Sequence, residues 1–334
     1  MFRFASRACA AIGLLAMTAC GPSTPPVDPK KIAADVSALA DTYVRSYLDA
    51  FPYQAIVIGA NDAHPSLLGD HSLPALKKWQ AREDELLASL KKIDVKAIDD
   101  MPEATTYEFL QNQLESSIGY RVCRMELWNV SPTYTGWQGD LPIAAGMQNV
   151  SRPQDQQDAI ARWSQVAQYL DDEIANLKEG LKLGYSAPKS NVQSVLNQMN
   201  AMLAAPIDES PFVQMAKPGA PASFKKALQA QEQKLIRPAI TRYRDFLVQT
   251  YLAAAREAIG VSANPDGAAC YVAAVKYHAT VKMTAQEIHD LGKAQIEKIT
   301  AEMKTIGKRS FNTEDPAALL KLVTTDPKYR FKNR

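Results

Sequence analysis

The residue types in this chain that could do chemistry are four histidines and four cysteines. Zinc-dependent hydrolysis needs two helical histidines one turn apart, a third ligand and a glutamate that activates water. The four histidines, His64, His71, His278 and His289, do not form a His-Glu-x-x-His sequence. Eleven residues separate His278 from His289 across a predicted helix break, so their mutual geometry stays open. We therefore assign no catalytic or metal-binding residue, and the favoured interpretation of both histidines is structural.

Two of the cysteines, Cys123 and Cys270, have no recognisable motif around them. In an oxidising compartment such a pair can form a disulfide, which would restrict the unfolded chain because the enclosed loop is long. The alternative is that each thiol is a small buried hydrophobe, since one sequence cannot place the two within bridging distance. The sequence leaves both interpretations open.

The N-terminus has the pattern of a bacterial export signal. Two arginines precede an apolar run, residues 8–19, that is shorter than the roughly 18 to 20 residues of a membrane-spanning helix. The run ends in Met17-Thr18-Ala19 directly before Cys20, which resembles a lipobox although leucine is commoner at the first position. We predict a signal peptide over 1–19, a lipid on Cys20 and a Pro-rich tether over 20–30. The alternative is an ordinary cleaved signal followed by a chance cysteine.

Export with a lipid anchor predicts a location on the periplasmic side of the outer membrane. Two of the 38 basic residues, Arg3 and Arg7, leave with the signal peptide, which balances the 36 acidic residues. A neutral chain with interspersed charges has neither the clustered positive charge that binds nucleic acid nor a polybasic patch that binds membranes. The membrane is therefore an expected partner only through the lipid at Cys20.

Apolar residues recur at three- and four-residue steps along most of the mature chain, which is the spacing of helices with one buried face. Strand-like alternation is scarce. We therefore predict an all-α fold, a multi-helix array of amphipathic helices that forms one domain over residues 31–334. The clearest apolar stripes are Ile32–Tyr47, Ile160–Leu181, Val192–Met202, Ser223–Ile259 and Ile288–Ile306, and Pro238 is expected to kink or divide the fourth.

Residues 128–153 depart from this pattern, because proline and glycine interrupt them too often for a long helix. Long loops in helical domains are usually functional or disordered, and Trp128, Tyr134 and Trp137 argue against disorder. The loop either lines a cleft or is fastened to the core by its aromatic side chains, and we favour the second interpretation.

Neighbouring carboxylates occur in two charged runs, Asp171-Asp172-Glu173 and Arg82-Glu83-Asp84-Glu85. Adjacent positions on a helix point in different directions. We therefore expect both runs to be solvated faces rather than acid–base pairs.

The sequence Thr284-Ala285-Gln286-Glu287 has the form of a capping box and predicts a helix start. The surrounding segment, residues 267–299, resembles the central part of a large bacterial family named only as domain of unknown function 885. Residues 184–192 and 52–72 are similar to two further segments of that family. The resemblance covers essentially all of the mature chain and is most specific over residues 260–300.

This resemblance implies exported lipoproteins, longer than this chain, that are related to helical zinc metallopeptidases. The metal motif of the family, His-Glu-x-x-Pro-Gly-His, belongs to a C-terminal half that this sequence does not contain. Zinc and a peptide substrate are therefore expected only for the complete architecture. In that architecture we expect Tyr277, His278 and His289 to line a substrate cleft beside the metal helix.

Two functional hypotheses follow from these patterns. In the first, the chain is the N-terminal portion of a metallopeptidase-like protein, incomplete at its C-terminus and without hydrolase activity alone. Its exposed apolar helix faces would then favour self-association. In the second, the chain is a membrane-tethered periplasmic binding or scaffold protein.

Overall fold

The computed structural model describes residues 28–60 and 63–331. The predicted signal peptide, Cys20 and most of the tether lie outside the described residues. Within them the fold is all-α, as the sequence predicted, and the β-type pairing found there is an isolated bridge between Pro188 and Arg256.

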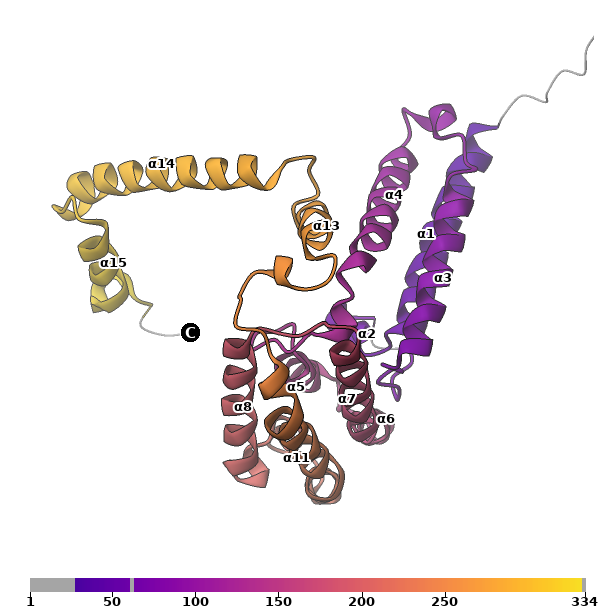
Figure 1. Ribbon diagram of the computed structural model, residues 1–334, viewed down its shortest axis with the longest axis vertical. Helices are drawn as coiled ribbons and strands as arrows, with labels where there is room; N and C mark the ends of the chain where they lie inside the picture. Colours follow the sequence, from indigo (N-terminus) through magenta and orange to yellow (C-terminus); the bar gives the residue numbers. More distant parts are fainter. Residues whose placement is uncertain (1–27, 61–62, 332–334) are drawn as a thin grey trace, which may run out of the picture.

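The helices fall into groups that follow the order of the chain (Figure 1). The N-terminal bundle contains α1 (Pro29–Ala50), α3 (Leu73–Leu90) and α4 (Pro102–Tyr120). The main body contains α5 (Trp137–Met147), α6 (Pro153–Trp163), α7 (Val166–Lys182), α8 (Lys189–Ala204), α9 (Pro211–Gln214), α10 (Ala222–Gln231), α11 (Arg237–Phe246) and α12 (Leu252–Ala254). The short α2 (Gln54–Val57) joins the two groups, α13 (Gly267–Ala279) packs against α4, and the C-terminal arm consists of α14 (Ala285–Phe311) and α15 (Pro316–Thr325).

The N-terminal bundle has its own hydrophobic core, to which α1, α3 and α4 contribute residues such as Val36, Leu90 and Leu114. The first helix begins at Pro29, inside the end of the predicted tether, where the Asp28 side chain accepts a hydrogen bond from the Lys30 amide. Toward the main body the apolar core gives way to aromatic rings with centroid separations of 5.1 to 6.3 Å, from Tyr43, Tyr47, Phe51 and Trp79. The bundle therefore ends in an aromatic surface that faces the main body.

The main body is organised around α7, whose residues Leu170 and Leu177 are fully buried. This helix packs against α11 on one side and against residues 125–127 on another. A Cβ atom at Gly180 would overlap the carbonyl oxygen of Leu127. Glycine at this position therefore permits the close approach between α7 and the chain that enters the main body.

The predicted single helix over residues 160–181 is two helices, α6 and α7, with a break at Ser164 and Gln165. At the break the Gln165 side chain donates to the carbonyl of Ser66 at 2.8 Å and accepts from the amide of Leu68 at 3.2 Å. The Gln165 side chain thus satisfies backbone hydrogen-bonding groups of Ser66 and Leu68, in a segment that crosses the helix at this point. Hydrophobic periodicity cannot predict such a contact, because the two partners are distant in sequence.

The predicted helix over residues 223–259 ends at Ala254 and contains two π-helical turns, at Glu232–Ile236 and Leu247–Tyr251. The first π turn directly precedes α11, in whose first turn Pro238 lies. The backbone stays helical without interruption from Ala222 to Ala254, so Pro238 lies inside one helical stretch. Proline lacks the amide hydrogen that a helix interior uses, and the π turn directly before it changes the hydrogen-bond pattern at this position. The helix is therefore not divided at Pro238.

The expectation of an irregular loop over residues 128–153 was wrong for residues 137–147, which form α5 with Pro142 inside it. This helix buries Leu141, Ala144 and Ala145 completely. Tertiary burial compensates for the hydrogen bond that Pro142 cannot make, because packing supplies most helix stability in proteins.

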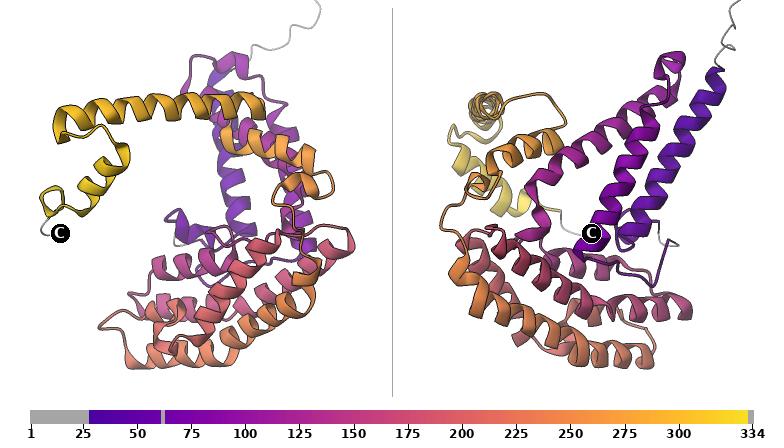
Figure 2. Two further views of the ribbon diagram at one scale, coloured as in Figure 1. Left: turned by 60° about the vertical axis from the view of Figure 1, so that its left-hand side comes forward. Right: turned by 45° about the vertical axis from the view of Figure 1, so that its right-hand side comes forward.

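The C-terminal arm begins at the predicted capping box. The Thr284 hydroxyl accepts from the Glu287 amide at 3.2 Å, and the Glu287 carboxylate accepts from the Thr284 amide at 2.7 Å. Beyond this start α14 extends away from the bundle and the main body, and α15 folds back against it (Figures 1 and 2).

No helix in the described part of the chain combines the length and the apolar character that crossing a membrane requires.

Candidate functional site

A cavity of about 990 Å³, here called the central cavity, lies where the N-terminal bundle meets the main body. Its walls come from α1, α3, α5, α7 and the segments that join them. Aromatic rings form much of the lining, from Phe51, Tyr53, Trp79, Trp137 and Tyr169. A concave site with aromatic walls and a few placed polar groups is the usual form of a small-molecule site.

The most buried ionisable pair in the cavity wall joins His71 to Glu173 of α7. The histidine Nε2 lies 2.6 Å from Oε1 of Glu173, and the two side chains are 31% and 8% exposed. The histidine ring stacks on Tyr169 with centroids 4.3 Å apart, and Asn176 donates to the His71 carbonyl at 2.9 Å. These contacts from one helix fix both the position and the orientation of the imidazole.

Burial and nearby charges set the protonation of His71 and of the neighbouring Tyr169. Burial lowers the pKa of His71, but the adjacent Glu173 carboxylate raises it more, so the pKa lies above its ordinary value. Burial, reinforced by the same carboxylate, raises the pKa of Tyr169 well above its ordinary value. His71 therefore holds a proton readily, whereas Tyr169 stays neutral.

A second carboxylate, Asp140, lies in the first turn of α5. The Tyr53 hydroxyl donates to its Oδ2 atom at 2.7 Å. Burial and the neighbouring Asp140 both raise the pKa of Tyr53, so this hydroxyl remains a donor at neutral pH. The cavity thus contains two oriented carboxylates, Glu173 with a histidine partner and Asp140 with a phenol partner.

The chemistry open to this arrangement is binding and proton transfer. His71 could exchange a proton with a bound molecule, and its orientation by Glu173 is the usual arrangement for that role. Within the described parts of the chain, no group of three or more histidine, cysteine, aspartate or glutamate side chains is placed to hold a metal ion.

Of the three residues expected to line a cleft in the complete architecture, two lie together at the end of α13. The Tyr277 ring stacks on Tyr120 of α4 with centroids 4.7 Å apart, and the His278 ring meets Tyr120 edge-on at 5.7 Å. His289 is exposed on α14, beyond a turn at which Thr280 adopts positive φ. None of the three belongs to the lining of the central cavity. Their role in a longer architecture stays a prediction.

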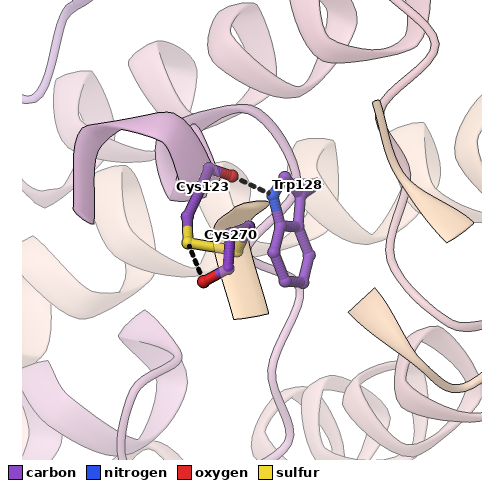
Figure 3. Close-up of a disulfide and its surroundings, with 3 residues drawn as sticks. All are labelled: Cys123, Trp128 and Cys270. Atoms are coloured by element: carbon purple, nitrogen blue, oxygen red, sulfur yellow. Dashed lines mark hydrogen bonds between the residues drawn. A yellow bond between two sulfur atoms is a disulfide. The ribbon is translucent and has the colours of Figure 1, made fainter. Parts of the chain in front are cut away.

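Cys123 and Cys270 form a disulfide in the structure, with Cα atoms 4.5 Å apart (Figure 3). The bond joins the segment after α4 to the first turn of α13, and both residues are buried. The Trp128 indole donates to the Cys123 carbonyl at 2.8 Å, and the Arg256 guanidinium lies over the indole ring at 5.1 Å. The disulfide therefore fastens α13 to the body of the protein in an enclosed, aromatic surrounding.

The expectation that both charged runs are solvated faces was wrong for one residue in each. Glu173 is buried against His71, whereas Asp171 of the same run is exposed and pairs with Arg242. Glu83 is only 2% exposed and accepts from Arg121 at 2.8 Å. One member of each run lies on the buried side of its helix because adjacent helical positions face different directions.

A sequence signal for Glu173 existed. It follows Val166 and Leu170 and precedes Leu177 at steps of four, three and four residues, so it continues the buried stripe of α7. A carboxylate on an apolar stripe requires a partner. No comparable signal marks His71 or Asp140, because His71 lies outside any predicted helix and Asp140 in a predicted loop.

Comparison with known proteins agrees with this fold. The structure is similar to the crystal structure of a candidate lipoprotein from Colwellia psychrerythraea, with a TM-score of 0.70 at 16% sequence identity. The likeness covers 90% of this chain and 54% of that chain, so this chain spans about half the length of that protein. The search of curated proteins gives no match. Residues 52–334 match the family described as bacterial protein of unknown function, DUF885, and the chain therefore belongs to that family.

Proposed function

We propose that this chain is an exported, lipid-anchored protein that binds an organic ligand in the central cavity. The observation that carries the proposal is the cavity itself, with its aromatic walls and the oriented pairs His71–Glu173 and Tyr53–Asp140. Buried ionisable groups cost stability unless they are satisfied, and their concentration around one cavity is typical of a binding site.

A thermal-shift screen of the mature chain tests binding. A panel of dipeptide amides, amino acids, sugars and nucleosides should contain at least one compound that raises the unfolding temperature, because a ligand that binds only the folded state stabilises it. The cavity-filling variant Ala75→Phe should abolish that shift, whereas Ala301→Phe on the exposed face of α14 should retain it. A panel without a single cavity-dependent shift would overturn the proposal.

The lipid anchor rests on the sequence around Cys20 and is supported by the likeness to a candidate lipoprotein. The test is incorporation of radiolabelled palmitate into the protein in a bacterial host. We expect labelling of the wild type and none of Cys20→Ser. Equal labelling of both would contradict the anchor.

A second candidate function is favoured by the length of the similar structure, of which this chain covers 54%. Under this proposal the chain corresponds to the N-terminal portion of a metallopeptidase-like protein and does not hydrolyse peptides alone. The apolar side chains that α14 leaves exposed, such as Ile296, would then pack on the missing portion.

The two proposals predict different results when the chain is extended. Peptidase activity and bound zinc should be measured on the mature chain and on a version extended through a family C-terminal half. The second candidate predicts activity and zinc only in the extended protein. Activity in neither version would remove this candidate and leave the binding function.

A further inference from the structure

The side chains that line the central cavity carry an excess of negative charge. The positively charged lining residues are Lys78 and Arg82, joined by His71 when it is protonated. The lining carboxylates are Asp49, Asp70, Glu85, Glu126, Asp140 and Glu173. A cavity with this balance attracts cations because its low-dielectric walls focus the field.

The ion pairs of the structure neutralise only part of this charge. Arg82 pairs with Glu85 at 3.0 Å, and His71 pairs with Glu173 at 2.6 Å. Outside the lining, Arg124 pairs with Glu126 at 2.7 Å, and His64 lies 2.6 Å from Asp49 and neutralises it only when protonated. Asp70 and Asp140 form no ion pair with any described residue. Of the cavity carboxylates, these two therefore lack a cationic partner.

Asp140 is the better placed of the two to receive a ligand. Asp70 is exposed and accepts the Ser72 amide, so it is occupied in local backbone geometry. Asp140 is half-buried, and the only hydrogen bond to its side chain in the described structure comes from Tyr53. A carboxylate accepts several hydrogen bonds, so Asp140 retains capacity for a charged donor.

The aromatic lining complements a positive charge at this point. Trp137, one helical turn before Asp140, and Tyr53, its hydrogen-bond donor, both line the cavity. The faces of aromatic rings attract ammonium and guanidinium groups, most strongly where water is excluded. Carboxylate and rings together offset the loss of hydration that a cation suffers on entering the cavity.

We infer that the ligand of the central cavity carries a primary ammonium or guanidinium group, which seats against Asp140 beside Tyr53 and Trp137. The inference rests on the proposed binding function and names the chemical class of its ligand. A cavity of about 990 Å³ is larger than one such group, so the rest of the ligand occupies the part lined by Trp79 and Tyr169.

The test uses two probes that differ in charge but hardly in shape, L-argininamide and L-citrullinamide. Both carry a positively charged α-amino group, so each is compared with its N-acetyl form. Acetylation removes that charge and leaves the guanidinium as the only positive charge of the arginine probe. Isothermal titration of the mature wild-type chain should show tighter binding of N-acetyl-argininamide than of N-acetyl-citrullinamide by about tenfold or more. The preference should shrink as ionic strength rises.

Two variants test whether the preference for the charged probe depends on Asp140. Asp140→Asn should lower the affinity for N-acetyl-argininamide by about tenfold and leave the affinity for the uncharged N-acetyl-citrullinamide unchanged. The matched control, Asp41→Asn, changes an exposed aspartate of α1 outside the cavity and should bind both probes as the wild type does. The ionic-strength series on the wild type serves as the second measurement should Asp140→Asn fold poorly.

The outcomes separate this inference from the proposed function. Equal binding of the charged and uncharged probes, or a cavity-dependent panel compound without a positive charge that binds more tightly, overturns the cationic class and leaves the binding function intact. Absence of binding by every probe and every panel compound overturns both.

Discussion

Helices α7 and α14 are both amphipathic, but they differ in what covers their apolar faces. Six residues of the 17-residue α7 are buried, including Leu170 and Glu173. In the 27-residue α14 the buried residue is Gly307, and Ile296 is 66% exposed. Each helix has the apolar spacing of a buried stripe, but only α7 is enclosed by other elements.

This difference shows what hydrophobic periodicity determines. The pattern specifies that a segment is helical and which side is apolar, because both follow from the helical repeat. It does not specify the partner, which comes from segments distant in sequence. In α7 the partners are α11 and residues 125–127, whereas α14 has α15 as its main neighbour.

The largest expected effect tests the enclosed helix against the exposed one. Leu170→Ala should lower the free energy of unfolding by about 2–5 kcal/mol, because it removes a fully buried side chain and leaves a cavity. Ile296→Ala should change it by less than about 0.5 kcal/mol. Urea denaturation followed by circular dichroism measures both. A comparable loss in the two variants would show that α14 is covered in solution, for example by self-association.

The disulfide fastens α13, the helix before α14, to the segment after α4, and its removal should have the next largest effect. The double variant Cys123→Ala with Cys270→Ala should lose about 2–4 kcal/mol, because the bridge closes a loop with a sequence separation of 147 residues. Amide hydrogen exchange in α13 should then rise toward that of α14, while exchange in α7 stays slow. Unchanged protection of α13 would show that its packing on α4 suffices.

A pair of glycines sharpens the comparison further. Gly180→Ala in α7 should destabilise the protein by about 1–3 kcal/mol, because the new Cβ meets the Leu127 carbonyl and the backbone must shift. Gly292→Ala in α14 meets nothing within 4 Å and should stabilise that helix by roughly 0.5–1 kcal/mol. Thermal unfolding of both variants checks the opposite signs. The same sign in both would refute the proposed difference in enclosure.

The smallest effect concerns the His71–Glu173 pair. Because the folded-state pKa of His71 lies above its unfolded value, the stabilisation is complete below about pH 6.5 and is lost as pH rises through the raised pKa. His71→Gln should therefore cost more stability in mildly acidic than in mildly alkaline buffer. Denaturant midpoints at the two pH values, for wild type and variant, measure the difference. An equal cost at both would mean that the pair contributes through packing alone.

Much of the fold could be predicted from the sequence, and the parts that could not share one cause. The helices α1 and α8 and the capped start of α14 follow from local spacing and capping residues. The break between α6 and α7 could not be predicted, because Gln165 serves a segment about a hundred residues earlier. The helix α5 was missed for a similar reason, since its stability comes from burial in the main core.

The candidate site was harder to predict than the fold. His71, Asp140, Tyr53 and Glu173 come from four separate segments that meet only when the bundle packs on the main body. Of these, Glu173 alone carries a local signal, as a carboxylate within an apolar stripe. The resemblance to DUF885 implied a cleft lined by Tyr277 and His278, but neither residue belongs to the lining of the central cavity.

The two π turns of the segment from Ala222 to Ala254 have a consequence for alignments of DUF885 sequences. A π turn holds one residue more than the α-helical turn it replaces, so Glu232–Ile236 and Leu247–Tyr251 each add one residue to this helical stretch. A relative with an ordinary α-helical turn at one of these places needs one residue fewer there to present the same helix face, the face that carries Tyr243 and Tyr251. Single-residue gaps inside this helix are therefore expected at these two turns, and there a one-residue deletion should be best tolerated.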